Sequence, residues 1–197
     1  MTMSAHTQTE HHTTLGLDHR KLGFWVFLAS ECVFFMSLII TFIIYSGRPQ
    51  EGPTHEVLNI PLTAFNTFVL LTSSLSMVLA VDATRRGDKR QMQLWLLATI
   101  LMGSFFIGVQ VFEYRELMHE GLTLTSNLFG MSFYLLTGFH GAHVTFGILW
   151  LIVVFIKSFG DTFGPHNDVP VDIMGLYWHF VDLVWVFLFP IVYLIKW

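Results

Sequence analysis

Cysteine and charge are scarce in this sequence. Cysteine occurs once, at Cys32, and Asp, Glu, Lys and Arg together make up only 12% of the 197 residues. A single cysteine excludes an internal disulfide and a metal site built from several cysteines, so we expect Cys32 to serve in packing. The net charge of -4 is small, and the acidic residues lie mostly in loops and at the ends, which does not indicate nucleic-acid binding.

Long polar segments are also absent between the apolar ones, whereas hydrophobic residues make up 53% of the chain. A helix that crosses a bilayer needs about 20 mainly apolar residues. No stretch shows the period-2 alternation of a membrane barrel, and unpaired backbone cannot cross lipid. The chain is therefore predicted to be an all-α integral membrane protein, a bundle of five transmembrane helices. The predicted spans are 22–45, 61–81, 92–112, 128–156 and 173–195.

The domain prediction follows from these spans. We expect residues 1–21 to form a polar cytoplasmic tail and residues 22–197 to form a single transmembrane domain. The short loops leave no room for a separate soluble catalytic domain. Whatever the chain does, it is expected to do in the membrane.

Positive charges predict the orientation of the bundle. One side of the predicted membrane carries seven Lys and Arg residues: Arg20, Lys21, Arg85, Arg86, Lys89, Arg90 and Lys157. The other side carries three: Arg48, Arg115 and Lys196. Because Lys and Arg are enriched on the cytoplasmic side, the N-terminus is predicted to be cytoplasmic and the C-terminus to be outside, in the periplasmic direction.

A glutamate, Glu31, lies in the middle of the first apolar stretch. An acidic side chain at the centre of a membrane helix costs about 2.5–3.5 kcal/mol, so such residues normally face a bundle interior, a partner or water. Glu31 is either a protonated carboxyl bonded to a neighbouring helix or a group that holds lipid, water or a proton beside a partner. The other polar residues expected at membrane depth are Gln110, Glu113, His140, His143, His179 and Asp182.

Three intramembrane histidines raise the question of haem or metal binding. His140 and His143 are three residues apart and share a helix face, as do His179 and Asp182. Two imidazoles on one helix do not suit a bis-His haem, and no helix carries a second Glu-x-x-His pair for a di-metal site. We therefore expect no catalytic, cofactor-binding or metal-binding residue in this chain. Two alternatives stay open: a stand-alone b-type membrane cytochrome, and a proton or solute channel centred on Glu31.

Small residues and aromatic residues predict local packing. Gly138, Gly141 and Thr145 fall on one stripe of the fourth helix and predict a close helix contact. The hydroxyls of Thr72, Ser73, Ser74 and Ser76 in the second helix are expected to bond their own backbone or a neighbouring helix. Amphipathic rings near the apolar borders are expected at headgroup depth: Trp25, Trp95, Trp178, Tyr193 and Trp197.

The polar residues stand in segments that resemble subunit III of the haem-copper oxidases. The three clearest segments are S-E-C-V-F-F at Ser30–Phe35, G-F-H-G-A-H-V at Gly138–Val144 and Y-W-H-F-V-D-L-V-W at Tyr177–Trp185. Three shorter ones follow the same order: Asn66–Leu71, Gly87–Met92 and Glu113–Tyr114. The resemblance spans the chain from its first helix to its end.

The resemblance implies a non-redox subunit of a proton-pumping terminal oxidase that reduces O₂ to water. In such an enzyme the haems and copper belong to partner subunits, and this subunit packs on subunit I, beside subunit II and others. It also binds phospholipid and sustains proton uptake and stability during turnover. Five helices resemble the short bacterial form, which implies the bacterial cytoplasmic membrane, and cytochrome c is favoured over quinol as the electron donor.

The resemblance also assigns residues. Glu31 matches the carboxylate beside the family's lipid cleft, and Lys21 is expected to contact a lipid headgroup near it. Structural, inter-helix or lipid-contact roles are expected for Glu113, His140, His143, His179 and Asp182.

Overall fold

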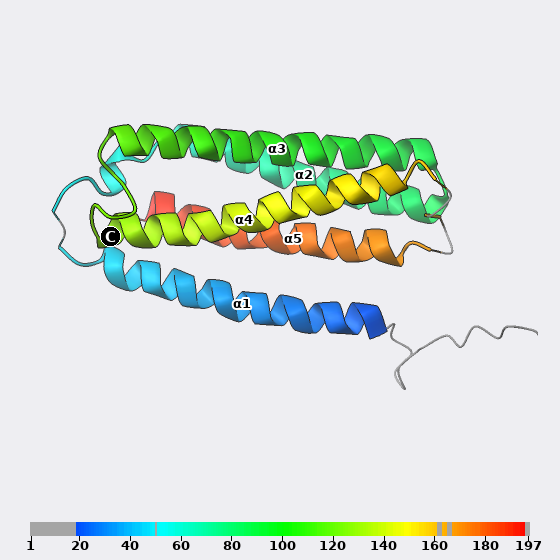
Figure 1. Cartoon of the computed structure of the whole chain (residues 1–197), viewed down its shortest axis with the longest axis horizontal. Helices are drawn as coiled ribbons and strands as arrows, with labels where there is room; N and C mark the ends of the chain where they lie inside the picture. The colour runs from blue at the N-terminus through cyan, green and yellow to red at the C-terminus, as the bar shows by residue number, and fades with distance from the viewer. Residues whose placement is uncertain (1–18, 50, 161–162, 165–166, 196–197) are drawn as a thin grey trace, which may run out of the picture.

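The computed structural model describes residues 19–49, 51–160, 163–164 and 167–195. Five long helices run through this part of the chain, which contains no strand, and each is long and apolar enough to cross a membrane (Figure 1). They are α1 (His19–Ser46), α2 (Ile60–Arg86), α3 (Lys89–His119), α4 (Leu128–Lys157) and α5 (Val169–Phe189). Two short elements, η1 (His55–Val57) and η2 (Pro190–Leu194), complete the described fold. The predicted all-helical five-span architecture is confirmed.

The helices extend beyond the predicted apolar spans. α3 is the clearest case, since it runs from Lys89 to His119 where 92–112 was predicted. α2 continues to Arg86 and α5 begins at Val169, four residues before its predicted start. The prediction followed apolar residues alone, whereas helical hydrogen bonding continues through polar residues at the membrane borders. Most of the predicted tail, residues 1–18, lies outside the described residues.

Consecutive helices α2 and α3 run antiparallel and pack closely side by side; α3 and α4 are also antiparallel neighbours, but α4 crosses the bundle at an angle (Figure 1). α1 lies along the outside of the bundle, over α4 and α5, and is the least buried helix (Figure 1). The starts of α1, α3 and α5 meet the ends of α2 and α4 at one end of the bundle. This end, called the basic end below, carries Lys21, Arg85, Arg86 and Lys157.

Local signals in the sequence set several helix ends. The Asn59 side chain accepts a hydrogen bond from the amide of Leu62 at 3.2 Å, as the Asn-x-Pro start of α2 predicts. Gly87 ends α2 with φ of 74°, a left-handed conformation that glycine adopts without strain. Asp88 then caps α3 through the amide of Gln91 at 3.1 Å. At Pro190, α5 gives way to π-helical hydrogen bonding in η2.

Aromatic side chains form the centre of the bundle. Trp178, Trp185 and Tyr193 are each at most 1% exposed. The prediction that Trp178 and Tyr193 anchor the chain among headgroups is therefore wrong, since both rings are buried in the protein core. Trp178 fits because Gly103 of α3 and Gly147 of α4 leave space beside its ring. A Cβ at Gly103 would lie 2.6 Å from the ring, and a Cβ at Gly147 would lie 3.0 Å from it. The indole N–H of Trp178 donates to Ser73 Oγ at 2.9 Å.

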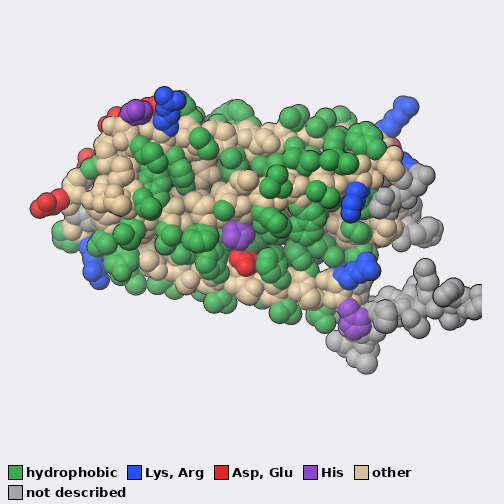
Figure 2. All heavy atoms as spheres, viewed as in Figure 1, with side chains coloured by type: hydrophobic (Ala, Val, Ile, Leu, Met, Phe, Trp, Pro, Cys, Tyr) green, Lys and Arg blue, Asp and Glu red, His purple; other side chains and the backbone are tan. Residues whose placement is uncertain are grey.

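The outside of the bundle is apolar. Large hydrophobic side chains on several helices are more than half exposed, among them Val33, Phe68 and Leu149. On the face seen in Figure 2, charged side chains gather at the two ends and hydrophobic side chains cover the length between them. An apolar surface of this extent requires a lipid or protein environment.

Candidate functional site

The polar centre of the outer surface is a pair formed by Glu31 of α1 and His143 of α4. Glu31 Oε2 lies 3.2 Å from His143 Nε2, and each side chain is 20% exposed. The face in Figure 2 has a histidine beside an acidic side chain midway along its length, far from the other charged groups. The two residues are 112 positions apart in the chain, so this contact had no local signal in the sequence.

The hydrogen bonds of His143 define how a proton is held there. His143 Nδ1 lies 2.7 Å from the carbonyl oxygen of Phe139, which can only accept, so Nδ1 carries a hydrogen. Nε2 then either accepts a hydrogen bond from a neutral Glu31 carboxyl group or carries a proton itself and donates a hydrogen bond to the Glu31 carboxylate. In both states the pair carries no net charge, which suits its depth in the membrane.

A cavity of about 360 Å³ opens over this pair. Its walls are mainly aromatic. One of them is Tyr177 of α5, whose hydroxyl donates a hydrogen bond to the carbonyl oxygen of His143 at 3.0 Å. The lining residues are Phe27, Glu31, Phe139, Ala142, His143, Phe146 and Tyr177. The pair is thus accessible from outside the bundle through an apolar opening.

His140, one turn before His143, is in a different environment. Its ring is fully buried and stacks on Trp185, with ring centroids 4.7 Å apart. Neither ring nitrogen of His140 has a hydrogen-bond partner in the part of the chain that the structure describes. The two histidines were predicted to share a face of α4, but His140 faces the core, whereas His143 faces α1.

His179 and Asp182 do not pair with each other. His179 Nδ1 lies 2.6 Å from Ser74 Oγ of α2. Asp182 is 3% exposed, and its two carboxyl oxygens have no partner among the described residues. His179 Nδ1 therefore bonds to α2 rather than to a carboxyl group of its own helix.

Glu113 binds three elements together inside the bundle. One carboxyl oxygen accepts from Thr63 Oγ1 of α2 at 2.8 Å, and the other accepts from the Tyr193 hydroxyl of η2 at 3.1 Å. The predicted hydrogen bonding by α2 hydroxyls is present at Ser73, Ser74 and Ser76. The predicted small-residue contact is present at Gly141, where a Cβ would come within 2.8 Å of Gln110, but Thr145 is exposed.

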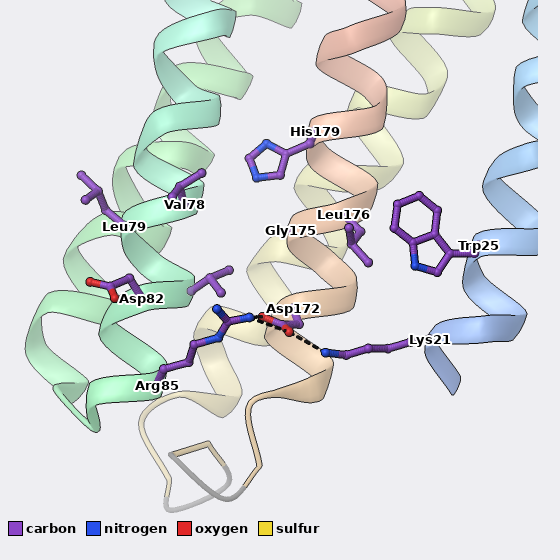
Figure 3. Close-up of a pocket in the computed structure, with 11 residues that line it drawn as sticks. Lys21, Trp25, Val78, Leu79, Asp82, Arg85, Asp172, Gly175, Leu176 and His179 are labelled. Atoms are coloured by element: carbon purple, nitrogen blue, oxygen red, sulfur yellow. Dashed lines mark hydrogen bonds and ion pairs between the residues drawn. The ribbon is translucent and has the colours of Figure 1, made fainter. Parts of the chain in front are cut away.

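Lys21 lies at the basic end, in an ion-pair cluster that the sequence analysis did not identify. Lys21 Nζ donates to Asp172 Oδ2 at 2.7 Å, and Arg85 Nη2 donates to both Asp172 oxygens at 2.8 and 2.9 Å. Figure 3 shows the two bases reaching Asp172 from opposite sides, one from α1 and one from α2. Lys21 and Glu31 are ten residues apart on α1, about 15 Å along the helix axis, so they line different cavities.

Asp172 was missed because its partners are 151 and 87 residues away along the chain. The available signal was weak: an acidic residue in the first turn of α5, at the end of the bundle where the bases gather. No three or more Cys, His, Asp and Glu side chains cluster as metal ligands within the described ranges.

The family model of cytochrome c oxidase subunit III matches this chain over residues 1–197. The chain belongs to that family. The resemblance inferred from Ser30–Phe35, Gly138–Val144 and Tyr177–Trp185 is therefore confirmed, and with it a multi-pass membrane protein of a terminal oxidase.

Relatives within the family carry two kinds of name. The chain is 39% identical to cytochrome c oxidase subunit 3 of Bacillus sp. (strain PS3) over 186 residues, 94% of this chain and 90% of the relative. It is 40% identical to the protein of the same name from Bacillus subtilis (strain 168), over 92% of this chain and 88% of the relative. It is also 39% identical to quinol oxidase subunit 3 of that strain, over 88% of this chain and 85% of the relative. Overall identity does not separate the two oxidase types.

Proposed function

We propose that this chain is the non-redox subunit III of a proton-pumping haem-copper oxidase that reduces O₂ to water in aerobic respiration. It packs on subunit I, contacts subunit II and other oxidase subunits, binds phospholipid, and sustains proton uptake and stability during turnover. The haems and copper are held by the partner subunits. The whole-chain family match is the observation that carries this proposal.

The Glu31–His143 pair supports a role at a lipid or protein contact. A polar pair midway along an apolar surface is unfavourable unless a neighbour offers hydrogen bonds or its charge stays neutral. The geometry provides neutrality through one shared proton, and the 360 Å³ opening gives a neighbouring lipid or helix access to it. We assign Glu31 and His143 to this contact, and Glu113, His140, His179 and Asp182 to packing between helices.

The proposed orientation places the basic end in the cytoplasm of a bacterial cell, with residues 1–21 as the tail and 22–197 as one transmembrane domain. Lys21, Arg85, Arg86 and Lys157 lie together at that end, which supports this orientation through the positive-inside rule. We further propose cytochrome c as the electron donor of the whole complex. The description of the matching family supports this choice, and the quinol oxidase relatives make quinol the competing donor.

A haem-ligand role for His143 and His179 has less support in the geometry. Both nitrogens of His143 are engaged, by Phe139 and Glu31, and His179 Nδ1 is engaged by Ser74. A channel centred on Glu31 likewise has less support, since the pair lies at the outer face between α1 and α4.

Affinity purification of the full chain from membranes in a mild detergent tests the proposed function. We expect it to carry with it an O₂-consuming complex with haem absorption and a preference for reduced cytochrome c over quinol. Faster oxidation of quinol would reassign the donor alone. A chain that never purifies with an oxidase, or that binds haem by itself, would contradict the proposed function.

A further inference from the structure

Glu113 is a buried acidic side chain to which the proposed function gives only a packing role. It lies on α3 and is 5% exposed. It is six residues from His119, where α3 ends, and 24 residues from Lys89 at the basic end, or about 9 Å and about 36 Å along the helix axis. Glu113 therefore lies near the end of the bundle opposite the basic end, which we call the far end.

The surroundings of Glu113 do not suit an ionised carboxylate. Its hydrogen-bond partners in the described part of the chain are two hydroxyl groups. The titratable side chains that interact with it include Tyr114, Tyr134 and Tyr193, which carry no positive charge. Arg115, the nearest base along α3, is at an exposed position. A buried carboxylate without a cationic partner is far less stable than the neutral acid, so we expect Glu113 to hold a proton.

The contacts of Thr63 lead to the same result by a count of hydrogens. Thr63 Oγ1 lies 2.8 Å from Glu113 Oε1 and 3.0 Å from the backbone carbonyl oxygen of Asn59. A carbonyl oxygen can only accept, and a threonine hydroxyl has one hydrogen, so Thr63 cannot donate to both oxygens. Both contacts are hydrogen bonds only when Glu113 supplies a hydrogen of its own, which reverses the direction of its bond to Thr63.

A neutral Glu113 completes a chain of three hydrogen-bond donors. Tyr193 of η2 donates to Oε2, Glu113 donates from Oε1 to Thr63, and Thr63 donates to the Asn59 carbonyl. When the carboxyl is ionised, the Thr63 hydroxyl turns toward it and gives up the bond to Asn59. Because the same oxygen atoms serve both arrangements, the carboxyl can gain or lose its proton without repacking the core.

We infer that Glu113 is a proton-binding site of this chain, occupied by one proton that joins α3 to α2 through Thr63. The bound proton removes a negative charge from the core and leaves each of the three side chains in the chain with an acceptor. The site is separate from the Glu31–His143 pair, which opens to the outer surface between α1 and α4. It goes beyond the proposed function, because it needs no partner subunit.

Infrared difference spectroscopy of the full chain at neutral pH, extracted with or without its partners, tests the inference. The spectrum of Glu113→Gln is subtracted from that of the wild type, so that the other carboxyl groups cancel. We expect the variant to lack one protonated-carboxyl C=O band per chain, and this band should shift to lower frequency in D₂O. Glutamine offers a donor and an acceptor where the neutral acid has them, so the variant should fold.

Thr63→Val is a second variant, which keeps the carboxyl and removes the group to which it donates. The C=O band of Glu113 should move to higher frequency, because an acid that loses its hydrogen-bond acceptor has a stronger C=O bond. This shift tests the site even if Glu113→Gln is not inserted into the membrane.

Each variant has a matched control. Glu116→Gln, at an exposed position of α3, should leave the band in place. Thr72 is an exposed threonine of α2 whose hydroxyl donates to the carbonyl of Phe68 at 2.8 Å, as that of Thr63 does to Asn59, but without a carboxyl beside it. Thr72→Val should therefore leave the frequency of the band unchanged.

Loss of ionised-carboxylate absorption in Glu113→Gln, in place of the protonated band, would overturn the inference. An unmoved band in Thr63→Val would also overturn it, since Glu113 would then donate elsewhere. A chain that shows the expected bands but never associates with an oxidase would contradict the proposed function and leave the proton site standing.

Discussion

Glu31 and His143 illustrate how two polar residues stay neutral on an apolar surface. Because the Phe139 carbonyl fixes the hydrogen on Nδ1, a single proton shared by Glu31 Oε2 and His143 Nε2 determines the state of the pair. The sequence predicted both residues as intramembrane polar groups. It could not predict their pairing, since the contact depends on how α1 lies against α4.

Replacing Glu31 tests this pair. Glu31→Ala leaves His143 Nε2 without its partner, and the free energy of unfolding should fall by about 0.6 kcal/mol, the average for hydrogen bonds between membrane helices. We expect the oxidase to assemble while lipid retention or proton-uptake kinetics change. The measurements are stability in mixed detergent, lipid content and single-turnover proton uptake. Unchanged lipid retention together with unchanged proton uptake would show that Glu31 serves only in packing.

Gly103 gives a prediction for the core. A Cβ at Gly103 would lie 2.6 Å from the buried Trp178 ring, so Gly103→Ala should destabilise the bundle by about 1–3 kcal/mol, the usual cost of overpacking. Gly108, on the same helix, has no atom within 4 Å of such a Cβ, so Gly108→Ala is the control and should be tolerated. Thermal unfolding of both variants checks this. Equal behaviour would refute the close packing of Trp178.

The helices themselves were largely predictable, because each needs a long apolar run to cross lipid. Their ends were predictable where a local signal exists, as at Asn59, Gly87 and Pro190. The position of α1 was not predictable, because it depends on contacts between distant segments. At the basic end, the contact that connects α1 to α5 is Lys21 with Asp172, 151 residues later.

Asp172→Asn tests this connection between helices. The substitution removes the charge that holds Lys21 and Arg85, whose side chains are 36% and 56% exposed. Because exposed pairs are weak, the loss should be about 1 kcal/mol, and it should appear as faster hydrogen exchange in the first turns of α1. Asp82→Asn, which affects an exposed pair within α2, should leave this exchange unchanged. Equal exchange in both variants would mean that packing alone holds α1.

The described part of the molecule is an apolar bundle whose acidic and basic side chains lie mainly in the core, at the ends and in the Glu31–His143 pair. Such a surface requires neighbours. The family match agrees with this requirement, since subunit III is part of a larger oxidase. The sequence predicted the family through three segments whose residues the structure places in the Glu31–His143 pair, the α4 core face and the Trp178–Trp185 core.

The most direct measurement of the central claim compares the oxidase purified from cells with and without this chain. We expect identical reduced-minus-oxidised haem spectra and similar initial activity, with faster loss of activity during sustained turnover when the chain is absent. Loss of haem from a correctly inserted subunit I, or an unchanged lifetime without the chain, would contradict the account of a non-redox subunit that supports turnover.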